Sequence, residues 1–178
     1  NVELSTAIDS FRIKASSAAA PSSAAFPYTL TINEQDDIQF DAVAASSNPI
    51  TFMAGGSIRL NSALATQGDL TITATRQSSG PTTTFRVSAP ISTTVGRIAI
   101  TADDVFVSNS LRVTAAALDP VQDDITLTAT GGSITLAGGI KAVNNLRLVQ
   151  SNLSSTVAGK VGGLALIAAT NIDIVAEG

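Results

Sequence analysis

Short apolar-x-apolar triplets recur along the chain, separated by the turn-forming residues Gly, Asn, Asp and Pro. Leu30, Ile50 and Leu70 begin three of these triplets and stand twenty residues apart. In the first two units a second triplet begins eight residues later, at Ile38 and Ile58. Because successive side chains of a strand point to opposite faces, each triplet predicts a short strand with two apolar residues in a core. Repetition at a fixed period indicates a solenoid.

A period of about 20 residues with three strands per coil assigns the apolar anchors of the chain to three faces. The first face takes Leu30, Ile50, Leu70, Ile91, Leu111, Ile134, Leu153 and Ile172. The second takes Ile38, Ile58, Ile98, Leu118, Ile140 and Val161, with a gap at 76–80. The third takes Val43, Leu64, Phe85, Val105, Ile125, Leu146 and Leu164. The extra residues of the longer intervals are expected at corners, where they leave the strands intact.

A period near 27 residues is the rival, because it aligns Ile58, Phe85 and Leu111. It would place Arg59, Arg86 and Arg112 in one outward column. Neighbouring strands lie about 4.8 Å apart, so like charges in such a column destabilise a sheet unless an anion lies between them. We therefore favour the shorter period.

The predicted fold class is an all-β, right-handed parallel β-helix of about seven or eight coils, the hand following the preference of parallel crossovers. It occupies residues 30–178. Residues 1–29 are expected to be the least regular part, with strands considered around Val2–Leu4 and Phe11–Ile13. The stretch ASSAAAPSSAAFP that follows predicts a loop or linker, or small residues that lie flat on the solenoid. No polar cap is evident at TNIDIVAEG, which predicts a longer chain or a stack.

Composition excludes several classes of function. The formal net charge is −4 and the ten Lys and Arg residues are dispersed, which argues against nucleic acid as a partner. No His and no Cys occur, so imidazole relays, His-ligated zinc and thiol nucleophiles are excluded. No apolar run reaches the roughly 20 residues of a membrane span. We predict no catalysis and no resident cofactor, except for the metal site considered next.

Paired acids form the sharpest polar feature: Asp36-Asp37, Asp103-Asp104 and Asp123-Asp124 each precede a strand. The 20-residue register places Asp103, Asp104, Asp123 and Asp124 at one corner of adjacent coils. Ca²⁺ takes six to eight oxygen ligands, so this corner is a candidate calcium site. The alternative is structural, since Asp before a strand closes an Asx turn with its own backbone.

Threonines form a second candidate site. The same register stacks Thr31, Thr51, Thr71 and Ser92 on one outward face. A flat array of hydroxyls could bind a regular lattice such as ice or a polysaccharide. The alternative is that Thr simply suits an exposed strand position.

Three stretches resemble the repeats of filamentous-haemagglutinin-type adhesins and other large bacterial surface proteins: GDLTITAT at 68–75, DDITLTATGGSITLAGGI at 123–140 and NNLRLVQSN at 144–152. The resemblance implies a shaft segment of a long exported protein at the cell surface. No functional residue carries over, because shaft repeats have no catalytic motif.

The predicted function is therefore a structural shaft or building block of an extracellular filament, layer or adhesin. Expected partners are further copies or other surface proteins, bound through the solenoid ends and flat faces. The first alternative is an adhesin module that binds glycan or a surface. The second is a β-helix carbohydrate-active enzyme, for which the Asp103, Asp104, Asp123 and Asp124 cluster would supply carboxylates.

Overall fold

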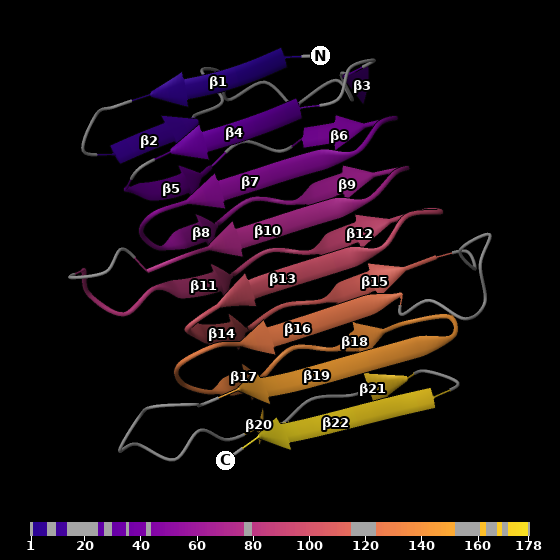
Figure 1. Cartoon of the computed structure of the whole chain (residues 1–178). Helices are drawn as coiled ribbons and strands as arrows, with labels where there is room; N and C mark the ends of the chain where they lie inside the picture. Colours follow the sequence, from indigo (N-terminus) through magenta and orange to yellow (C-terminus); the bar gives the residue numbers. More distant parts are fainter. Residues whose placement is uncertain are drawn as a thin grey trace.

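A computed structural model of the chain describes residues 2–6, 10–13, 25–26, 30–34, 36–41, 44–76, 80–114, 124–151, 161–162, 167–168 and 171–177. These residues form strands and turns and include no helix. The strands lie in three parallel sheets that run the length of the molecule, with the two chain ends at opposite ends of the stack (Figure 1). This arrangement confirms the predicted parallel β-helix with three strands per coil.

Each coil contributes one strand to each sheet, in the order A, B, C. Sheet A contains β1 (Val2–Thr6), β4 (Leu30–Glu34), β7 (Ile50–Ala54), β10 (Leu70–Ala74), β13 (Ile98–Ala102), β16 (Ile125–Ala129), β19 (Asn145–Ser151) and β22 (Asn171–Glu177). Sheet B contains β2 (Ser10–Ile13), β5 (Asp37–Phe40), β8 (Ile58–Leu60), β11 (Thr84–Val87), β14 (Asp104–Val107), β17 (Ile134–Leu136) and β20 (Val161–Gly162). Sheet C contains β3 (Ala25–Phe26), β6 (Ala44–Ser46), β9 (Leu64–Thr66), β12 (Ile91–Thr93), β15 (Leu111–Val113), β18 (Ile140–Lys141) and β21 (Ile167–Ala168).

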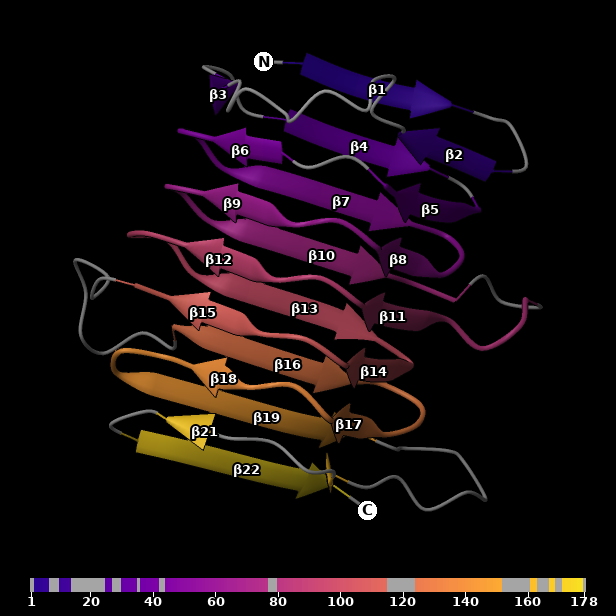
Figure 2. The same ribbon diagram turned by 180° about the vertical axis from the view of Figure 1, so that it is seen from behind.

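The described parts of the amino-terminal segment belong to the solenoid. Strands β1, β2 and β3 pair in parallel with β4, β5 and β6, as the rear view also shows (Figure 2). The solenoid therefore begins before Leu30, and β1 and β2 include the strands considered around Val2–Leu4 and Phe11–Ile13. Most of the Ala/Ser/Pro stretch, 14–24 and 27–29, lies outside the described residues.

The predicted register is correct for the first coils and wrong after Leu70. Leu30, Ile50 and Leu70 are Cα partners on successive strands, as predicted. The next partner of Leu70 is Ile98, however, and not Ile91. Most later anchors therefore shift from the predicted faces: Ile91, Leu111 and Ile140 stack on sheet C, Phe85, Val105 and Ile134 on sheet B, and Ile125 and Leu146 on sheet A. Val161 and Ile172 lie on their predicted faces, sheets B and A. Val43, Leu118, Leu153 and Leu164 lie outside the described residues.

Unequal corners explain this error. The step from sheet B to sheet C is six residues in six successive coils, beginning at Ile38, Ile58, Phe85, Val105, Ile134 and Val161. The step from sheet A to sheet B grows from eight residues at Ile50 to fifteen at Leu70. The coil beginning at Leu70 is consequently 28 residues long. The rejected interval of 27 residues thus holds for several steps, among them Ile58 to Phe85, Ile98 to Ile125 and Ile134 to Val161. The first of these steps pairs Arg59 with Arg86.

The interior is aliphatic and follows the predicted alternation. Strands such as β10, β13 and β16 show buried residues at their first, third and fifth positions. Phe52 and Phe85 are the largest side chains with no exposed surface, and Phe40 packs against Phe52 with ring centroids 5.6 Å apart. Each buried Ile or Leu contributes about 1.5–3 kcal/mol relative to an exposed one, so the stacked anchors hold the coils together.

Candidate functional site

Asp103 is the most highly connected polar side chain of the corner between sheets A and B. Its Oδ2 accepts hydrogen bonds from Arg76 Nε at 3.0 Å and from the Thr83 backbone N–H at 2.9 Å. Its Oδ1 accepts a hydrogen bond from Thr130 Oγ1 at 3.1 Å. Arg76 and Thr83 belong to the long connection between β10 and β11. The carboxylate therefore fastens this connection to the following coil.

Asp103 is only 7% exposed, and its ionisation reflects its partners. Burial alone would raise the pKa of Asp103, because desolvation disfavours the charged form. The hydrogen bonds from Thr83, Thr130 and Arg76, with the charge of Arg76, outweigh this effect and hold the pKa below its ordinary value. Asp103 is thus a structural carboxylate whose two oxygens are both occupied by protein donors.

Other aspartates, at the first residue of a strand or just before it, bridge consecutive coils in a common way. The Oδ1 atoms of Asp37, Asp69 and Asp104 accept the backbone N–H of Ser57, Arg97 and Ser133, at 2.5, 2.8 and 2.8 Å. Each of these donors belongs to the next coil. An Asx turn would use the aspartate's own backbone, whereas these contacts reach the backbone of the following coil. In these turns the carboxylate accepts a backbone N–H that would otherwise bond to a backbone carbonyl.

The structure does not bring the four predicted calcium ligands together. Asp103 and Asp104 follow β13 at its carboxyl end, whereas Asp124 precedes β16 at the amino end of the neighbouring strand. Five-residue strands separate these ends by roughly 15 Å. Asp123 lies outside the described residues. Among the residues that the structure describes, no three acidic side chains are grouped as metal ligands. The predicted register placed Asp124 on the wrong corner.

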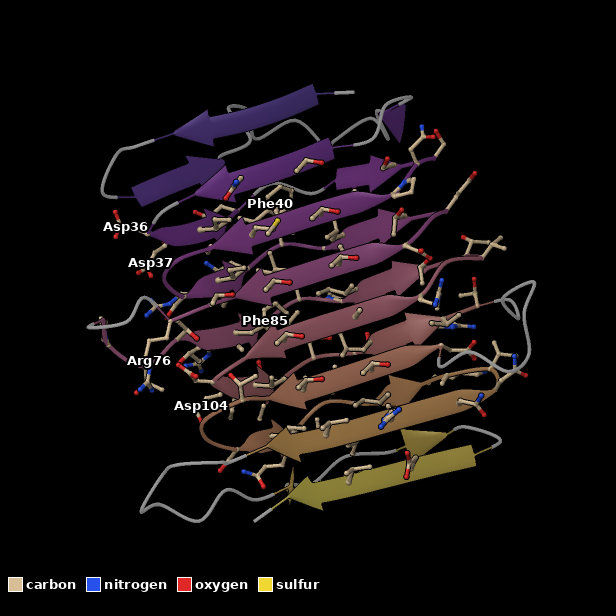
Figure 3. The ribbon with its side chains drawn as sticks, in the orientation of Figure 1. Asp36, Asp37, Phe40, Arg76, Phe85 and Asp104 are labelled. Carbon is tan, nitrogen blue, oxygen red and sulfur yellow. The ribbon has the colours of Figure 1, made fainter. Side chains whose placement is uncertain are left out.

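The other acidic pair lies on the same edge as Asp103 and Asp104. Figure 3 shows Asp36, Asp37, Arg76 and Asp104 along one side of the stack, where sheet A turns into sheet B. Asp37 and Asp104 are separated along this edge by Ser57 and Thr84, because these four residues occupy one register position of successive strands. The coils between them keep the acids apart.

Asp124 differs from the other described aspartates because one of its buried carboxylate oxygens has no hydrogen-bond partner. It has no exposed surface, and its Oδ2 accepts a hydrogen bond from the Asn144 backbone N–H. Its Oδ1 and the Asn144 Nδ2 are buried without a protein partner. An unpartnered buried polar atom costs about 1–3 kcal/mol, so this corner is a local weakness of the fold.

The structure stacks three of the four residues of the predicted surface column. Thr31, Thr51 and Thr71 are Cα partners on the outward side of sheet A. The column continues with Ala99 and Thr126. Ser92 does not belong to it, because Ser92 lies on sheet C between Ala65 and Arg112.

Sheet A carries a parallel column two residues further along its strands. It contains Asn33, Met53, Thr73, Thr101 and Thr128. From Thr31 to Thr128 the two columns contain no charged residue, and Met53 is 43% exposed. Between β4 and β16, sheet A thus presents an uncharged, regular face in which methyl and hydroxyl groups predominate.

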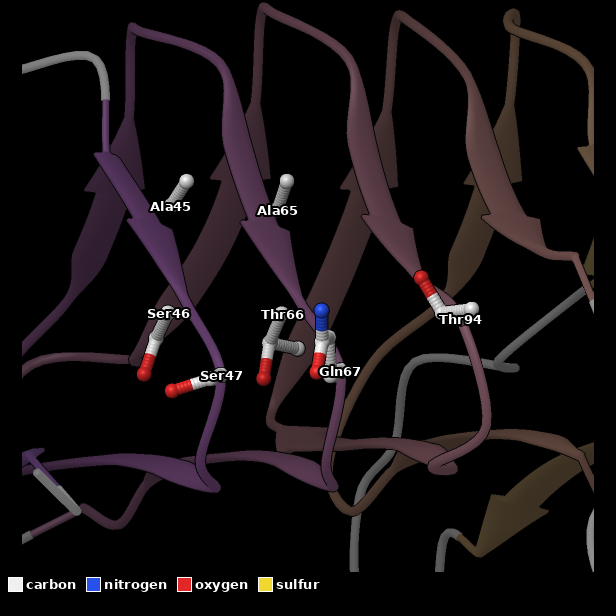
Figure 4. Close-up of a pocket in the computed structure, with 7 residues that line it drawn as sticks. All are labelled: Ala45, Ser46, Ser47, Ala65, Thr66, Gln67 and Thr94. Carbon is white, nitrogen blue, oxygen red and sulfur yellow. The ribbon is translucent and has the colours of Figure 1, made fainter. Parts of the chain in front are cut away.

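A shallow pocket of about 200 Å³ lies on sheet C (Figure 4). Its lining consists of Ala45, Ser46, Ser47, Ala65, Thr66, Gln67 and Thr94. The hydroxyl of Thr66 is already used within the turn, since it donates to the Asn48 carbonyl at 2.8 Å and accepts from the Gly68 N–H at 3.1 Å. The pocket arises because Ala45 and Ala65 are neighbours on this face and their side chains are small. Its lining contains no charged residue.

Sheet B carries a cationic pair that the sequence interpretation rejected. Arg59 and Arg86 are Cα partners on β8 and β11, and both are exposed. The Arg86 guanidinium carbon lies 4.9 Å from the centroid of the Phe106 ring on the following strand. The 27-residue spacing of the two arginines was the signal that could have identified this pair. Arg112 does not join it, because Arg112 lies on sheet C beside Lys141.

Comparisons of this chain with protein-family models, with curated proteins and with solved structures found no match. The resemblance to filamentous-haemagglutinin-type repeats therefore rests on the three stretches quoted above. Within the described ranges, there is no helix of the length and hydropathy needed to cross a bilayer.

Proposed function

We propose that this chain is a rigid shaft segment of an extracellular surface filament, layer or adhesin. The observation that supports the proposal is the continuity of the three parallel sheets. Sheet A alone has eight strands, which at about 4.8 Å per coil gives a rod about 34 Å long.

Rigidity follows from the way in which backbone groups are paired. Every internal strand bonds to the coil before it and to the coil after it, so a bend must break hydrogen bonds in a sheet. Corner donors are paired in the same manner: the Ile98 N–H donates to the Asp124 carbonyl and the Leu111 N–H to the Gly139 carbonyl. Axial continuity of this kind suits a spacer that holds another part of a protein away from a surface.

Electron microscopy of the native protein in its source cells tests this proposal. Gold-labelled antibodies against the folded chain should label intact cells, with the label displaced outward from the bilayer. Purified native protein should contain straight rods whose thickness matches a three-sided coil. Label that is found only after permeabilisation, or round particles without rods, would contradict a surface shaft.

A second candidate function is a glycan-binding adhesin module, which the uncharged face of sheet A favours. Thr51 and Thr71 lie side by side near its centre, and their hydroxyls repeat with the strand spacing of about 4.8 Å. A glycan array tests this role. Replacing Thr51 and Thr71 with Lys should abolish an array signal, and replacing Thr135 of sheet B with Lys serves as the matched control. An array without signal for the unmodified chain would remove this candidate.

A further inference from the structure

Arg59 and Arg86 are like charges in direct register without acidic partners. Their strands are neighbours, so the two side chains leave the sheet about 4.8 Å apart on the same face. Neither forms an ion pair within the described part of the chain. Other arginines do: Arg76 meets Asp103, Arg97 meets Asp69 and Arg147 meets Asp173, at 3.0, 3.9 and 3.6 Å. Arg112 and Lys141 on sheet C are also cations in register, but Lys141 lacks a guanidinium fork, so Arg59 and Arg86 are the neighbouring pair that offers two forks.

The surroundings of the pair supply further donors. Ser57 and Thr84 stand two residues before Arg59 and Arg86 on the same outward side of sheet B. Ser57 Oγ accepts the Thr84 backbone N–H at 3.0 Å, which leaves the Ser57 hydroxyl hydrogen as a donor. The guanidinium of Arg86 stacks on Phe106, on the side away from Arg59. The gap between the two arginines is thus bordered by N–H and O–H groups.

The nearest acids on this face are engaged elsewhere. Asp37 and Asp104 occupy the same column as Ser57 and Thr84, one coil before and one coil after them. Their Oδ1 atoms accept the Ser57 and Ser133 backbone N–H groups. Gln39 is the Cα partner of Arg59 on the preceding coil, and its Nε2 donates to Asp41 Oδ1 at 3.1 Å. These acids limit the positive charge to a small area and make the pair a site for one anionic group.

The number of donors indicates the shape of that group. A carboxylate offers two oxygens, which a single guanidinium fork can occupy. A sulfate or phosphate group offers three or four oxygens in a tetrahedron and can accept hydrogen bonds from two guanidinium groups at once. We propose that Arg59 and Arg86, assisted by the hydroxyls of Ser57 and Thr84, bind a tetrahedral oxyanion, either free or carried on a saccharide.

Titration of the isotopically labelled full chain with sodium sulfate and with sodium phosphate, followed by amide NMR, tests this site. Sodium chloride keeps the ionic strength constant, because exposed charges are screened by salt. The amides of β8 and β11 should shift along one saturable curve with a roughly millimolar dissociation constant, as expected for two exposed charge pairs. The variants Arg59→Gln and Arg86→Gln should each weaken binding about five-fold, the equivalent of about 1 kcal/mol.

Two variants separate this site from general charge effects. Arg97→Gln removes an exposed arginine from another corner and should leave the curve unchanged. Arg59→Lys keeps the charge but lacks the fork, so it should bind with intermediate affinity. The proposal is overturned if no amide shift saturates, or if Arg59→Gln and Arg86→Gln bind sulfate as well as the unmodified chain does.

The source of the oxyanion is distinguished with polymers. Dextran sulfate that binds more tightly per sulfate group than the inorganic ion would identify a sulfated saccharide as the ligand. Equal affinity would identify the free anion. Unsulfated dextran is the control, and binding of it at the same residues would overturn a site built on charge.

Discussion

The two corners on either side of sheet B follow different rules. Between sheets B and C, the anchors are six residues apart in successive coils, as in Ile58 to Leu64 and Phe85 to Ile91. Between sheets A and B the step varies from seven residues at Ile98 to fifteen at Leu70. From Ile38 onward the corner between sheets B and C keeps one length, whereas the corner between sheets A and B accepts insertions.

Backbone hydrogen bonding accounts for the fixed corner. The first turn residue in each coil donates its N–H to a carbonyl of the coil before it: Asn61 to Phe40, Ser88 to Leu60, Ser108 to Val87 and Ala137 to Val107. Side chains at this position range from amide to methyl, so the backbone hydrogen bond is the contact that these four coils share. At the variable corner, Asp37, Asp103 and Asp104 supply carboxylate acceptors in addition. A side-chain carboxylate can accept hydrogen bonds from a connection whose backbone does not follow that of the neighbouring coil.

Insertion of three residues, Gly-Ser-Gly, at each corner gives the largest expected contrast. Between Ser62 and Ala63 the insertion interrupts the stacked turn, and we expect a loss of more than about 4 kcal/mol in the free energy of unfolding. Between Gly80 and Pro81 the cost should be below about 1 kcal/mol, because lengthening a loop adds little closure entropy. Denaturant unfolding followed by circular dichroism measures both. Equal losses would show that the two corners are equally constrained.

Replacing one glycine by alanine at each corner tests the same contrast, because each substitution adds a single methyl group. A Cβ at Gly138, in the fixed corner, would lie 2.1 Å from the Asn109 carbonyl oxygen, which is backbone. A Cβ at Gly132, in the variable corner, would lie 2.1 Å from Asp104 Oδ1, which is a side-chain atom. Backbone of a stacked coil cannot move alone, whereas a carboxylate can rotate. We therefore expect Gly138→Ala to cost about 3 kcal/mol and Gly132→Ala about 1 kcal/mol in the same unfolding assay.

The contrast also explains how far the sequence could predict the fold. Alternation within triplets correctly identified the strands that begin at Ile50, Ile58 and Leu64, because side-chain period depends only on the local backbone. Register beyond Leu70 could not follow from a constant period, since the insertion at 75–83 alters the spacing of one corner and not of the others. A search for the invariant six-residue step, visible in IRLNSALAT and FRVSAPIST, would have found it.

The predicted placement of the candidate residues depended on register and was correct only where the register held. Thr31, Thr51 and Thr71 precede the insertion and stack as predicted. Asp124 follows the insertion and was placed on the wrong corner. The pairing of Arg59 with Arg86 was rejected because like charges repel. Like charges in register do repel, but the apolar residues on either side of each arginine determine the register. Burial of Ile58 and Phe85 contributes more free energy than the repulsion between two solvent-exposed arginines costs.

Asp103 tests whether carboxylates hold the variable corner. Asp103→Ala should cost about 2 kcal/mol, because the buried Thr83 N–H would lose its acceptor while the partly exposed Arg76 returns to water. Asp103→Asn keeps the size of the side chain and should cost less. Thermal or denaturant unfolding at neutral pH measures both changes. A neutral effect of Asp103→Ala would show that the inserted connection is held by other contacts.

The same residue predicts a dependence on pH. The pKa of Asp103 in the folded chain is below that of the unfolded chain, about 3.9, so ionised Asp103 favours folding. This contribution is complete above the unfolded pKa and is lost as pH falls through the folded pKa. The difference in unfolding free energy between the unmodified chain and Asp103→Asn should therefore be constant from about pH 7 to pH 5 and shrink below about pH 4. A difference that grows in acid would contradict the lowered pKa.

Asn61→Ala at the fixed corner should have the smallest effect. The Asn61 Nδ2 donates to Asp41 Oδ1 at 2.9 Å, but this contact is exposed, and Asp41 also accepts from Gln39 Nε2. Since the backbone N–H of Asn61 still donates to the Phe40 carbonyl, the loss should be about 0.5 kcal/mol in urea unfolding. A loss as large as that of Asp103→Ala would mean that stacked side chains hold the fixed corner too, and that its constant length has a cause other than backbone pairing.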